Sequence, residues 1–325
     1  MKLFALEASR AFGEAIAASL DRPLAAHEER AFEDGEHKTR PLERVRGADV
    51  YVVQSLHGGP DASPNDKLCR LLFFLATLKE HGAARVTAVV PYLAYARKDR
   101  QTQARDPVTT RYVAELFEAV GTDRIVTLEV HNIVAYQNAF RCETVHLDTR
   151  PLFAPIVEAV AGRDDVVVAS PDPGGVKRAQ LFQESLEARL GRPVASAFLE
   201  KRRSAGKVSG EHVVGEMKDR TVVIVDDLIS SGGTMARAAR ACRVQGARKV
   251  YAFAAHGLFT GSASEVMAAP ELARSYVTDS VPPFRLAPGL IPERVEVVPA
   301  APLFAGAIAR LHDNRSITEL SGAPD

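Results

Sequence analysis

The chain has 325 residues, enough for two domains of ordinary size. Its 41 basic and 41 acidic residues balance, so no overall charge draws it toward nucleic acid or an anionic membrane surface. No run approaches the roughly 18 uninterrupted apolar residues of a membrane span. We therefore expect a globular protein that holds any anionic ligand in a local site.

The N-terminal segment does not read as a secretion signal. Glu7, Arg10 and Glu14 interrupt its apolar residues, and the three cysteines of the chain are widely separated without a CxxC pair. Both features are typical of a protein with reduced thiols. The sequence predicts a cytoplasmic location.

Three segments share one pattern. Residues 81–92, 120–131 and 245–257 each end a helical stretch at a glycine and continue into an apolar, partly β-branched run. Glycine accepts the left-handed conformation that ends a helix, and a continuous apolar run suits a strand buried on both faces. The repeat predicts βαβ units and a parallel sheet.

Other strands are expected on either side of a break near residues 146–155. The pattern predicts an α/β fold with two domains, residues 1–147 and 148–325, each with a mostly parallel sheet flanked by helices. The amphipathic segment at 302–314 is predicted to be a helix that could return to the first domain. The further strands are expected at 49–55, 165–172, 221–227 and 295–300.

Two acids end one of these strands. In "VVIVDDLISSGGTM" (222–235), Asp226 and Asp227 precede a turn of small residues that opens a helix. Ligands of parallel α/β sheets bind beyond the carboxyl ends of the strands, and glycine N–H groups at a helix start attract phosphate. The lysine of the Walker A pattern is missing, which argues against an ordinary nucleoside-triphosphate loop. The predicted phosphate loop comprises Ser230, Ser231, Gly232, Gly233 and Thr234.

The two acids would repel a bare phosphate. They suit a sugar phosphate, because carboxylates can accept hydrogen bonds from sugar hydroxyls while the loop holds the phosphate. A plain helix cap is the alternative, but a cap needs only one Ser, Thr or Asp. The motif resembles the phosphoribosyl-pyrophosphate (PRPP) binding motif of the type I phosphoribosyltransferase fold, which base phosphoribosyltransferases, PRPP synthetases and binding-only regulators share.

Four more stretches resemble one family, ribose-phosphate pyrophosphokinase (PRPP synthetase). They follow in the family's order and are "AFEDGEHKTRP" (31–41), "PYLAYARKDRQ" (91–101), "ASPDPGGVKRA" (169–179) and "LEKRRSAGK" (199–207). The resemblance runs nearly from end to end. It implies two phosphoribosyltransferase-like domains, the first binding ATP and the second binding ribose 5-phosphate.

The resemblance also implies roles for single residues. The first stretch would hold the adenine ring and reach into a neighbouring subunit's site, which implies a homo-oligomer of at least two chains. The mobile fourth stretch would place Lys201 and Arg203 at the transferred group, and Mg²⁺ would be held by His131 and Asp172, with Glu129 as a third candidate. The implied ATP-binding residues are Phe32, Asp34, Gly35, Glu36, Arg97, Lys98 and Asp99.

The sequence departs from the family's pattern at three places, so the resemblance is to a divergent subgroup of the family. Glu129 stands where the family usually has Asp, Lys98 stands where many members have Gln, and Ser230–Ser231 replaces the usual Asp-Thr. Residues 57–64 look like an insertion.

The function implied is transfer of the β,γ-diphosphoryl group of ATP to the 1-hydroxyl of ribose 5-phosphate, giving PRPP and AMP. Two alternatives stay open: a kinase acting on ribose 1,5-bisphosphate or a related sugar phosphate, and a catalytically silent homologue that regulates an active partner. No role is expected for His37, His57, His146 or His256.

Overall fold

The computed structural model describes residues 1–204 and 207–321, and for residues 200–213 and 321 it describes no side chains. The chain forms two compact units. The first contains residues 1–148 and 300–320, and the second contains residues 149–299. Within the described residues, no helix is long and apolar enough to cross a membrane.

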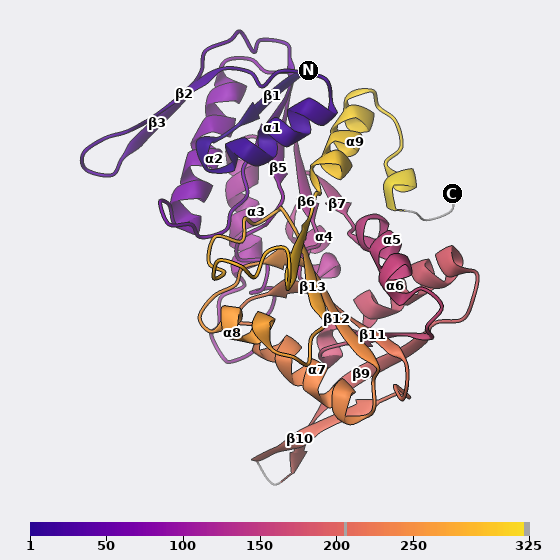
Figure 1. Cartoon of the computed structure of the whole chain (residues 1–325). Coiled ribbons are helices and arrows are strands. Elements are labelled where there is room, and N and C mark those ends of the chain that lie inside the picture. The colour runs from indigo at the N-terminus through magenta and orange to yellow at the C-terminus, as the bar shows by residue number, and fades with distance from the viewer. Residues whose placement is uncertain (205–206, 322–325) are drawn as a thin grey trace. The chain divides into compact units, whose positions relative to one another are not determined.

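The first unit is built on a five-stranded parallel sheet (Figure 1). Its strand order is β1-β4-β5-β6-β7, so each new strand is added on the same side of the last. The strands are β1 (Lys2–Ala5), β4 (Asp49–Val53), β5 (Arg85–Val90), β6 (Arg124–Leu128) and β7 (Glu143–Leu147). The helices are α1 (Arg10–Ser19), α2 (Pro64–Glu80), α3 (Thr109–Ala119), α4 (Ile133–Ala139) and α9 (Ala301–His312).

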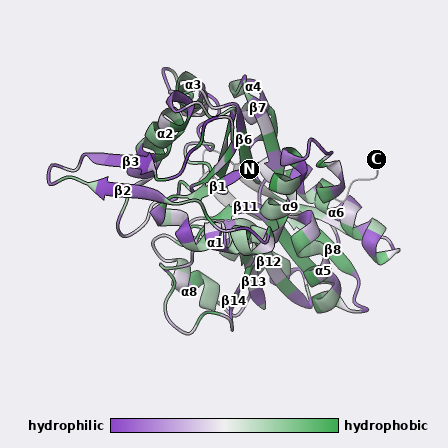
Figure 2. Cartoon of the chain, turned by 90° about the horizontal axis from the view of Figure 1, so that it is seen from above, coloured by the Kyte–Doolittle hydropathy of each residue, from purple (hydrophilic) through white to green (hydrophobic). Residues whose placement is uncertain are grey.

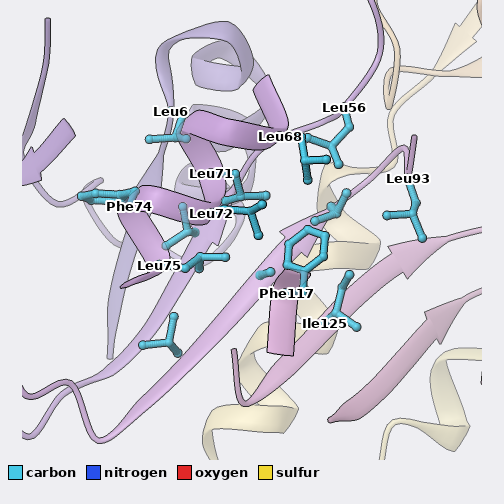
Figure 3. Close-up of a cluster of buried hydrophobic side chains, with 14 of the residues drawn as sticks. Leu6, Leu56, Leu68, Leu71, Leu72, Phe74, Leu75, Leu93, Phe117 and Ile125 are labelled. Carbon is cyan, nitrogen blue, oxygen red and sulfur yellow. The ribbon is translucent and has the colours of Figure 1, made fainter. Parts of the chain in front are cut away.

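Helix α2 shows how the sequence sets a boundary and a core. The Ser63 hydroxyl accepts a hydrogen bond from the Asp66 N–H, the Asp66 carboxylate accepts one from the Ser63 N–H, and Pro64 occupies the first turn. The helix then buries a leucine-rich face against β5 (Figure 3). The labelled side chains of this core are Leu6, Leu56, Leu68, Leu71, Leu72, Phe74, Leu75, Leu93, Phe117 and Ile125.

The last helix, α9, belongs to this first unit. It packs against α1, where the rings of Phe12 and Phe304 meet edge to face with centroids 5.4 Å apart. At its C-terminal end, His312 Nδ1 lies 2.8 Å from Asp49 Oδ2 on β4. The carboxylate of Asp49 also accepts hydrogen bonds from Arg85 and Tyr51, so one acid joins the helix to two strands.

A two-stranded hairpin stands apart from the sheet. It is formed by β2 (His27–Ala31) and β3 (His37–Pro41), and its strands are largely hydrophilic (Figure 2). The end of β3 next to the hairpin turn rests on α2, where the His37 and Phe73 rings stack with centroids 5.5 Å apart. Its tip carries the stretch expected to hold the adenine ring.

The second unit is built on a seven-stranded sheet with the order β10-β9-β8-β11-β12-β13-β14, in which only β10 is antiparallel. The strands are β8 (Val166–Ser170), β9 (Ala195–Ser204), β10 (Lys207–Val214), β11 (Thr221–Ile229), β12 (Lys249–Gly257), β13 (Arg274–Thr278) and β14 (Val295–Val298). The helices are α5 (Arg150–Ala161), α6 (Val176–Leu190), α7 (Gly233–Val244) and α8 (Ala263–Ala268).

Most of the expected elements are present with shifted ends, and the predicted fold class is confirmed by two helix-flanked, mostly parallel sheets. The stretch at 199–207, expected as a loop, lies largely in the β9 and β10 strands, and its mobility stays a prediction. One further expectation was wrong. Asp226 and Asp227, expected to end their strand, lie inside β11, because pairing with β12 extends that strand to Ile229.

Candidate functional site

The strand order of the second unit reverses between β8 and β11. After β8 the chain adds β9 and β10 on one side, and after β11 it adds β12 to β14 on the other. The connections that leave the carboxyl ends of β8 and β11 therefore diverge, and open α/β sheets bind their ligands at such a point. The sheet of the first unit has no such reversal.

The two acids lie at this reversal. Pairing between β8 and β11 ends at Ile224, while pairing between β11 and β12 continues to Ile229. Asp226 and Asp227 thus occupy a part of β11 that has lost its neighbour on the β8 side. A polar ligand can approach them from that side without breaking the sheet.

Arg178, on the first turns of α6, balances the two acids. Its Nη1 lies 3.5 Å from Oδ1 of Asp226 and 3.5 Å from Oδ1 of Asp227. All three side chains are largely buried, and Asp227 is 4% exposed. Among the described contacts, one guanidinium thus lies 3.5 Å from two carboxylates.

Burial and the neighbouring carboxylate both act on Asp226. Burial, followed by the neighbouring Asp227 charge, raises the pKa of Asp226 well above its ordinary value, and Arg178 opposes the rise. The Asp226 carboxylate also accepts a hydrogen bond from the Asp227 N–H at 2.9 Å. The site therefore favours a ligand that brings hydrogen-bond donors or positive charge to the carboxylates.

The loop after β11 has the features of a phosphate cradle. Gly232 has φ +78° and stands at the N-terminus of α7, and a Cβ built on it would lie 2.8 Å from Cγ1 of Val266. Ser230 is fixed by Thr260, whose N–H donates to the Ser230 carbonyl at 3.0 Å. The Arg237 guanidinium donates to Thr234 Oγ1 at 3.3 Å and adds positive charge beside the loop.

Asp172 lies in the connection that follows β8. Its Oδ1 accepts hydrogen bonds from the N–H groups of Gly174 and Gly175, at 2.9 and 3.2 Å, and so caps the 3-10 helix Pro173–Gly175. This short helix contacts β11, which places the Asp172 segment beside the strand of the two acids. Among the described residues, the other oxygen of this carboxylate, Oδ2, takes no hydrogen bond.

Lys201 and Arg203 lie in β9, where Lys201 is in register with Glu211 and Arg203 with Val208 on β10. Their side chains are outside the described part of the structure, so their predicted roles remain predictions. Their strand neighbours β8 directly.

In the first unit, two predicted stretches meet. The segment at 91–101 follows β5 and the segment at 129–132 follows β6, and these parallel strands are adjacent. Asn132 Nδ2 donates to Asp99 Oδ2 at 2.7 Å and joins the two segments directly. The candidate ATP loop and the candidate metal segment therefore lie next to each other at the carboxyl ends of β5 and β6.

Within the ATP loop, the two basic residues differ. Lys98 forms an ion pair with Asp106, and this contact, the first of several hydrogen bonds to Asp106, holds the pKa of that carboxyl far below its ordinary range. Arg97 is exposed and, among the described residues, makes no ion pair. Arg97 is thus better placed than Lys98 to meet an incoming phosphate.

The hairpin tip is folded around the predicted adenine segment. The Phe32 N–H donates to the Glu36 carbonyl at 2.8 Å, and Asp34 accepts from the Glu36 N–H at 3.0 Å. Gly35, the remaining predicted residue of the tip, has φ +93°. The Phe32 ring is 40% exposed, with the Arg30 guanidinium 5.1 Å from its centroid. The tip thus presents a partly exposed aromatic ring with the Arg30 guanidinium over one face.

The three metal candidates differ in how accessible their side chains are. The described residues contain no group of three His, Cys, Asp or Glu side chains arranged to hold a metal. Mg²⁺ usually binds through one or two carboxylates plus substrate phosphates and keeps several waters. His131 is exposed and Asp172 offers one oxygen, whereas Glu129 is 7% exposed with φ +40°. These properties favour His131 and Asp172 over Glu129.

The sequence reasoning missed Arg178, Arg237 and Asn132. All three lie within or beside stretches that the motifs had marked, and Asn132 directly follows His131. The partners of Arg178 and Asn132 lie on neighbouring strands or loops, so only the strand order could have shown them. Arg237 lies three residues from its partner Thr234 in α7, and the helical spacing after the motif was the signal that could have found it.

Comparison with known proteins agrees with this architecture. The model of the N-terminal domain of ribose phosphate pyrophosphokinase matches residues 1–121, and the model of the phosphoribosyl synthetase-associated domain matches residues 204–321. Together these two models cover most of both units.

Individual relatives match over nearly the whole chain. The ribose-phosphate pyrophosphokinase of Caldanaerobacter subterraneus subsp. tengcongensis is 37% identical, covering 98% of this chain and 97% of its own. That of Hyphomonas neptunium is 35% identical, covering 98% and 99%. The crystal structure of phosphoribosylpyrophosphate synthetase from Mycobacterium smegmatis superposes with a TM-score of 0.85 at 33% identity, covering 96% of this chain and 99% of that chain. This chain therefore belongs to the ribose-phosphate pyrophosphokinase family.

Proposed function

We propose that this chain transfers the β,γ-diphosphoryl group of ATP to the 1-hydroxyl of ribose 5-phosphate, giving PRPP and AMP. The observation that carries the proposal is the placement of Asp226 and Asp227 beside a glycine loop at the reversal of strand order. Acids for ring hydroxyls and a helix N-terminus for the 5-phosphate together match a pentose phosphate. Family membership supports the same reaction.

In this reaction the O1 oxygen of the sugar forms a bond to the β-phosphorus of ATP. The bond from that phosphorus to the α,β-bridging oxygen breaks, AMP leaves with the electron pair, and the hydroxyl proton passes to solvent. Asp226 and Asp227 orient the ring hydroxyls, while the 230–234 loop fixes the phosphate end. Lys201 and Arg203 are assigned to the charge that builds on the transferred group, a contribution that can reach about 10³-fold in rate for an arginine.

On the nucleotide side, Phe32 would stack on the adenine ring, with Asp34, Gly35 and Glu36 at its edge. Arg97 would meet the phosphates, and Asp99 would fix the loop. His131 and Asp172 would hold Mg²⁺, which when bound offsets the negative charge of the triphosphate oxygens. Because the hairpin stands apart from its own sheet, we assign its tip to the site of a second copy in a homo-oligomer.

The test is an assay of purified protein with ATP, Mg²⁺ and a panel of sugar phosphates that includes ribose 5-phosphate and ribose 1,5-bisphosphate. AMP formed in equal amount to PRPP is the expected product of ribose 5-phosphate. Formation of ADP instead would show single-phosphoryl transfer and refute the proposal, as would no turnover of any sugar phosphate.

Lys201→Ala is expected to lower AMP formation by about 10³-fold or more, because it removes charge at the transferred group. Binding of ribose 5-phosphate, measured by calorimetry, should stay within about threefold of the wild type. The matched control is Lys249→Ala, an exposed lysine at the start of β12, which should leave the rate unaltered. Full turnover by Lys201→Ala would remove this lysine from the mechanism.

A further inference from the structure

Asn132 makes three hydrogen bonds with one side chain. Its Oδ1 accepts from the N–H groups of Val134 and Ala135, at 3.1 and 3.2 Å, and so caps α4. Its Nδ2 donates to Asp99 Oδ2 at 2.7 Å. Because the cap fixes the side chain, the amide NH₂ points at Asp99 from a rigid base.

The loop that contains Asp99 is organised internally around another acid. Asp106 accepts hydrogen bonds from Lys98, from the Thr102 N–H and hydroxyl at 3.1 and 2.7 Å, and from the Gln103 N–H at 3.1 Å. The hydroxyl of Thr110, on α3, donates to the Lys98 carbonyl at 3.1 Å. The loop is therefore tied to itself and to α3, and Asn132 ties it to the segment after β6.

This bond depends on the chemical identity of both partners. Asp99 can only accept when ionised, so residue 132 must donate to it, and it must also accept from the helix N–H groups. Asparagine does both. Aspartate would keep the cap but would place a second carboxylate against Asp99.

We propose that Asn132 is a positioning residue that sets the place of the Asp99 loop relative to His131, its direct neighbour in the chain. The consequence for ATP rests on the proposed function: the loop with Arg97 and the segment with His131 then meet the same triphosphate. The ribose 5-phosphate site draws on residues of the other unit and does not depend on this bond.

The test exchanges the two partners. Asn132→Asp keeps the cap and turns the bond into a repulsion. Adding Asp99→Asn restores a bond of opposite direction, because the new amide at 99 donates to the new carboxylate at 132. The control is Asn138→Asp, the same substitution at an exposed position of α4.

Two readouts are measured. Amide hydrogen exchange at Thr102 and Gln103, without substrates, should quicken by about tenfold in Asn132→Asp, the factor expected for loss of one hydrogen bond to a charged group. The KM for ATP should rise by about tenfold while the KM for ribose 5-phosphate stays within about twofold. In the double variant both should return to within about threefold of the wild type, and Asn138→Asp should alter neither.

The proposal is overturned if Asn132→Asp exchanges like the wild type, if the second substitution restores nothing, or if exchange recovers while the KM for ATP does not. If the wild type forms no PRPP, the proposed function fails on its own. Hydrogen exchange and the affinity for ATP measured by calorimetry then still decide whether Asn132 positions the loop.

Discussion

At the scale of single residues, the second unit places two buried carboxylates side by side. Both lie near the guanidinium of Arg178, and the pKa of Asp226 is raised by burial and by the Asp227 charge. Such an arrangement costs stability in the unliganded protein, and it is typical of sites that a ligand completes. Asp226 and Asp227 are expected to serve binding at the expense of stability.

Asp226→Asn is therefore expected to stabilise the protein and weaken its function. An acid whose pKa is raised by folding contributes stability below its unfolded-state pKa, about 3.9, and loses that contribution as pH rises through the folded-state pKa. The asparagine side chain is neutral at every pH, so at pH 7 the variant does not carry the cost of a buried charge at position 226. We expect Tm to rise by about 2–4 °C, as about 1 kcal/mol produces in a domain of this size.

The measurement is thermal unfolding of the variant and the wild type between pH 4 and pH 8, alongside the KM for ribose 5-phosphate. The gain in Tm should shrink as pH falls toward 4, while the KM should rise by about tenfold or more, since a carboxylate that accepts sugar hydroxyls is lost. A Tm below that of the wild type at pH 7 would contradict the electrostatic account.

At the scale of elements, the C-terminal helix α9 is attached to the first unit through Asp49. This acid accepts from Arg85 Nε and Nη2, at 2.8 and 2.7 Å, from Tyr51 Oη at 3.1 Å and from His312 Nδ1 at 2.8 Å. Although burial favours its neutral form, the hydrogen bonds from Arg85 and His312 hold the pKa of Asp49 below its ordinary value. Its contribution to stability is thus present above pH 4 and is lost as pH falls below that.

Asp49→Ala is expected to lower the free energy of unfolding by about 2–3 kcal/mol at pH 7, because Arg85 and Tyr51 keep their donors but lose the acceptor. Urea unfolding followed by circular dichroism measures this change. Glu115→Ala, which breaks the exposed pair with Arg111, should cost less than about 0.5 kcal/mol. Equal losses in the two variants would mean that Asp49 does not anchor the helix.

At the scale of the whole molecule, the sequence predicted those elements whose burial leaves a pattern. Strands β5, β6 and β12 are buried along almost their full length and were expected from their apolar runs. By contrast, β7 (ETVHL) and β13 (RSYVT) were missed, because each contains only two apolar residues among polar ones and so shows no continuous apolar run. The length of the apolar run decided which strands could be recognised.

The sequence predicted which residues belong to the candidate site, but it did not predict which of them lie in contact. The acids and the glycine loop are consecutive in the chain, so a motif reveals them. Arg178 is 48 residues from Asp226, and Asn132 is 33 residues from Asp99. Contacts of this kind depend on which strands lie side by side, and a single sequence carries no direct record of that order.

If the hairpin of one copy completes the nucleotide site of another, two inactive variants should complement each other. Phe32→Ala removes the stacking surface from the donating hairpin, and Lys201→Ala removes the charge from the receiving site. In an equal mixture, re-associated after dissociation, about a quarter of the sites would combine two intact halves. We expect about 25% of the wild-type rate per site, measured as AMP formation.

Each variant alone serves as the baseline of this experiment, and light scattering of the mixture reports the assembly. Activity of the mixture no greater than the mean of the two baselines would place both residues in a site formed by one chain.

The close approach between Gly232 and Val266 has a consequence for how this protein can be altered. Two separate constraints disfavour a side chain at position 232. The backbone there is left-handed, and the space that a Cβ would need is filled by a methyl group of Val266. Replacing Val266 with alanine would relieve only the steric constraint. A saturation library at 232 should therefore return glycine alone among folded, substrate-binding clones, even in a background where the facing valine has been reduced.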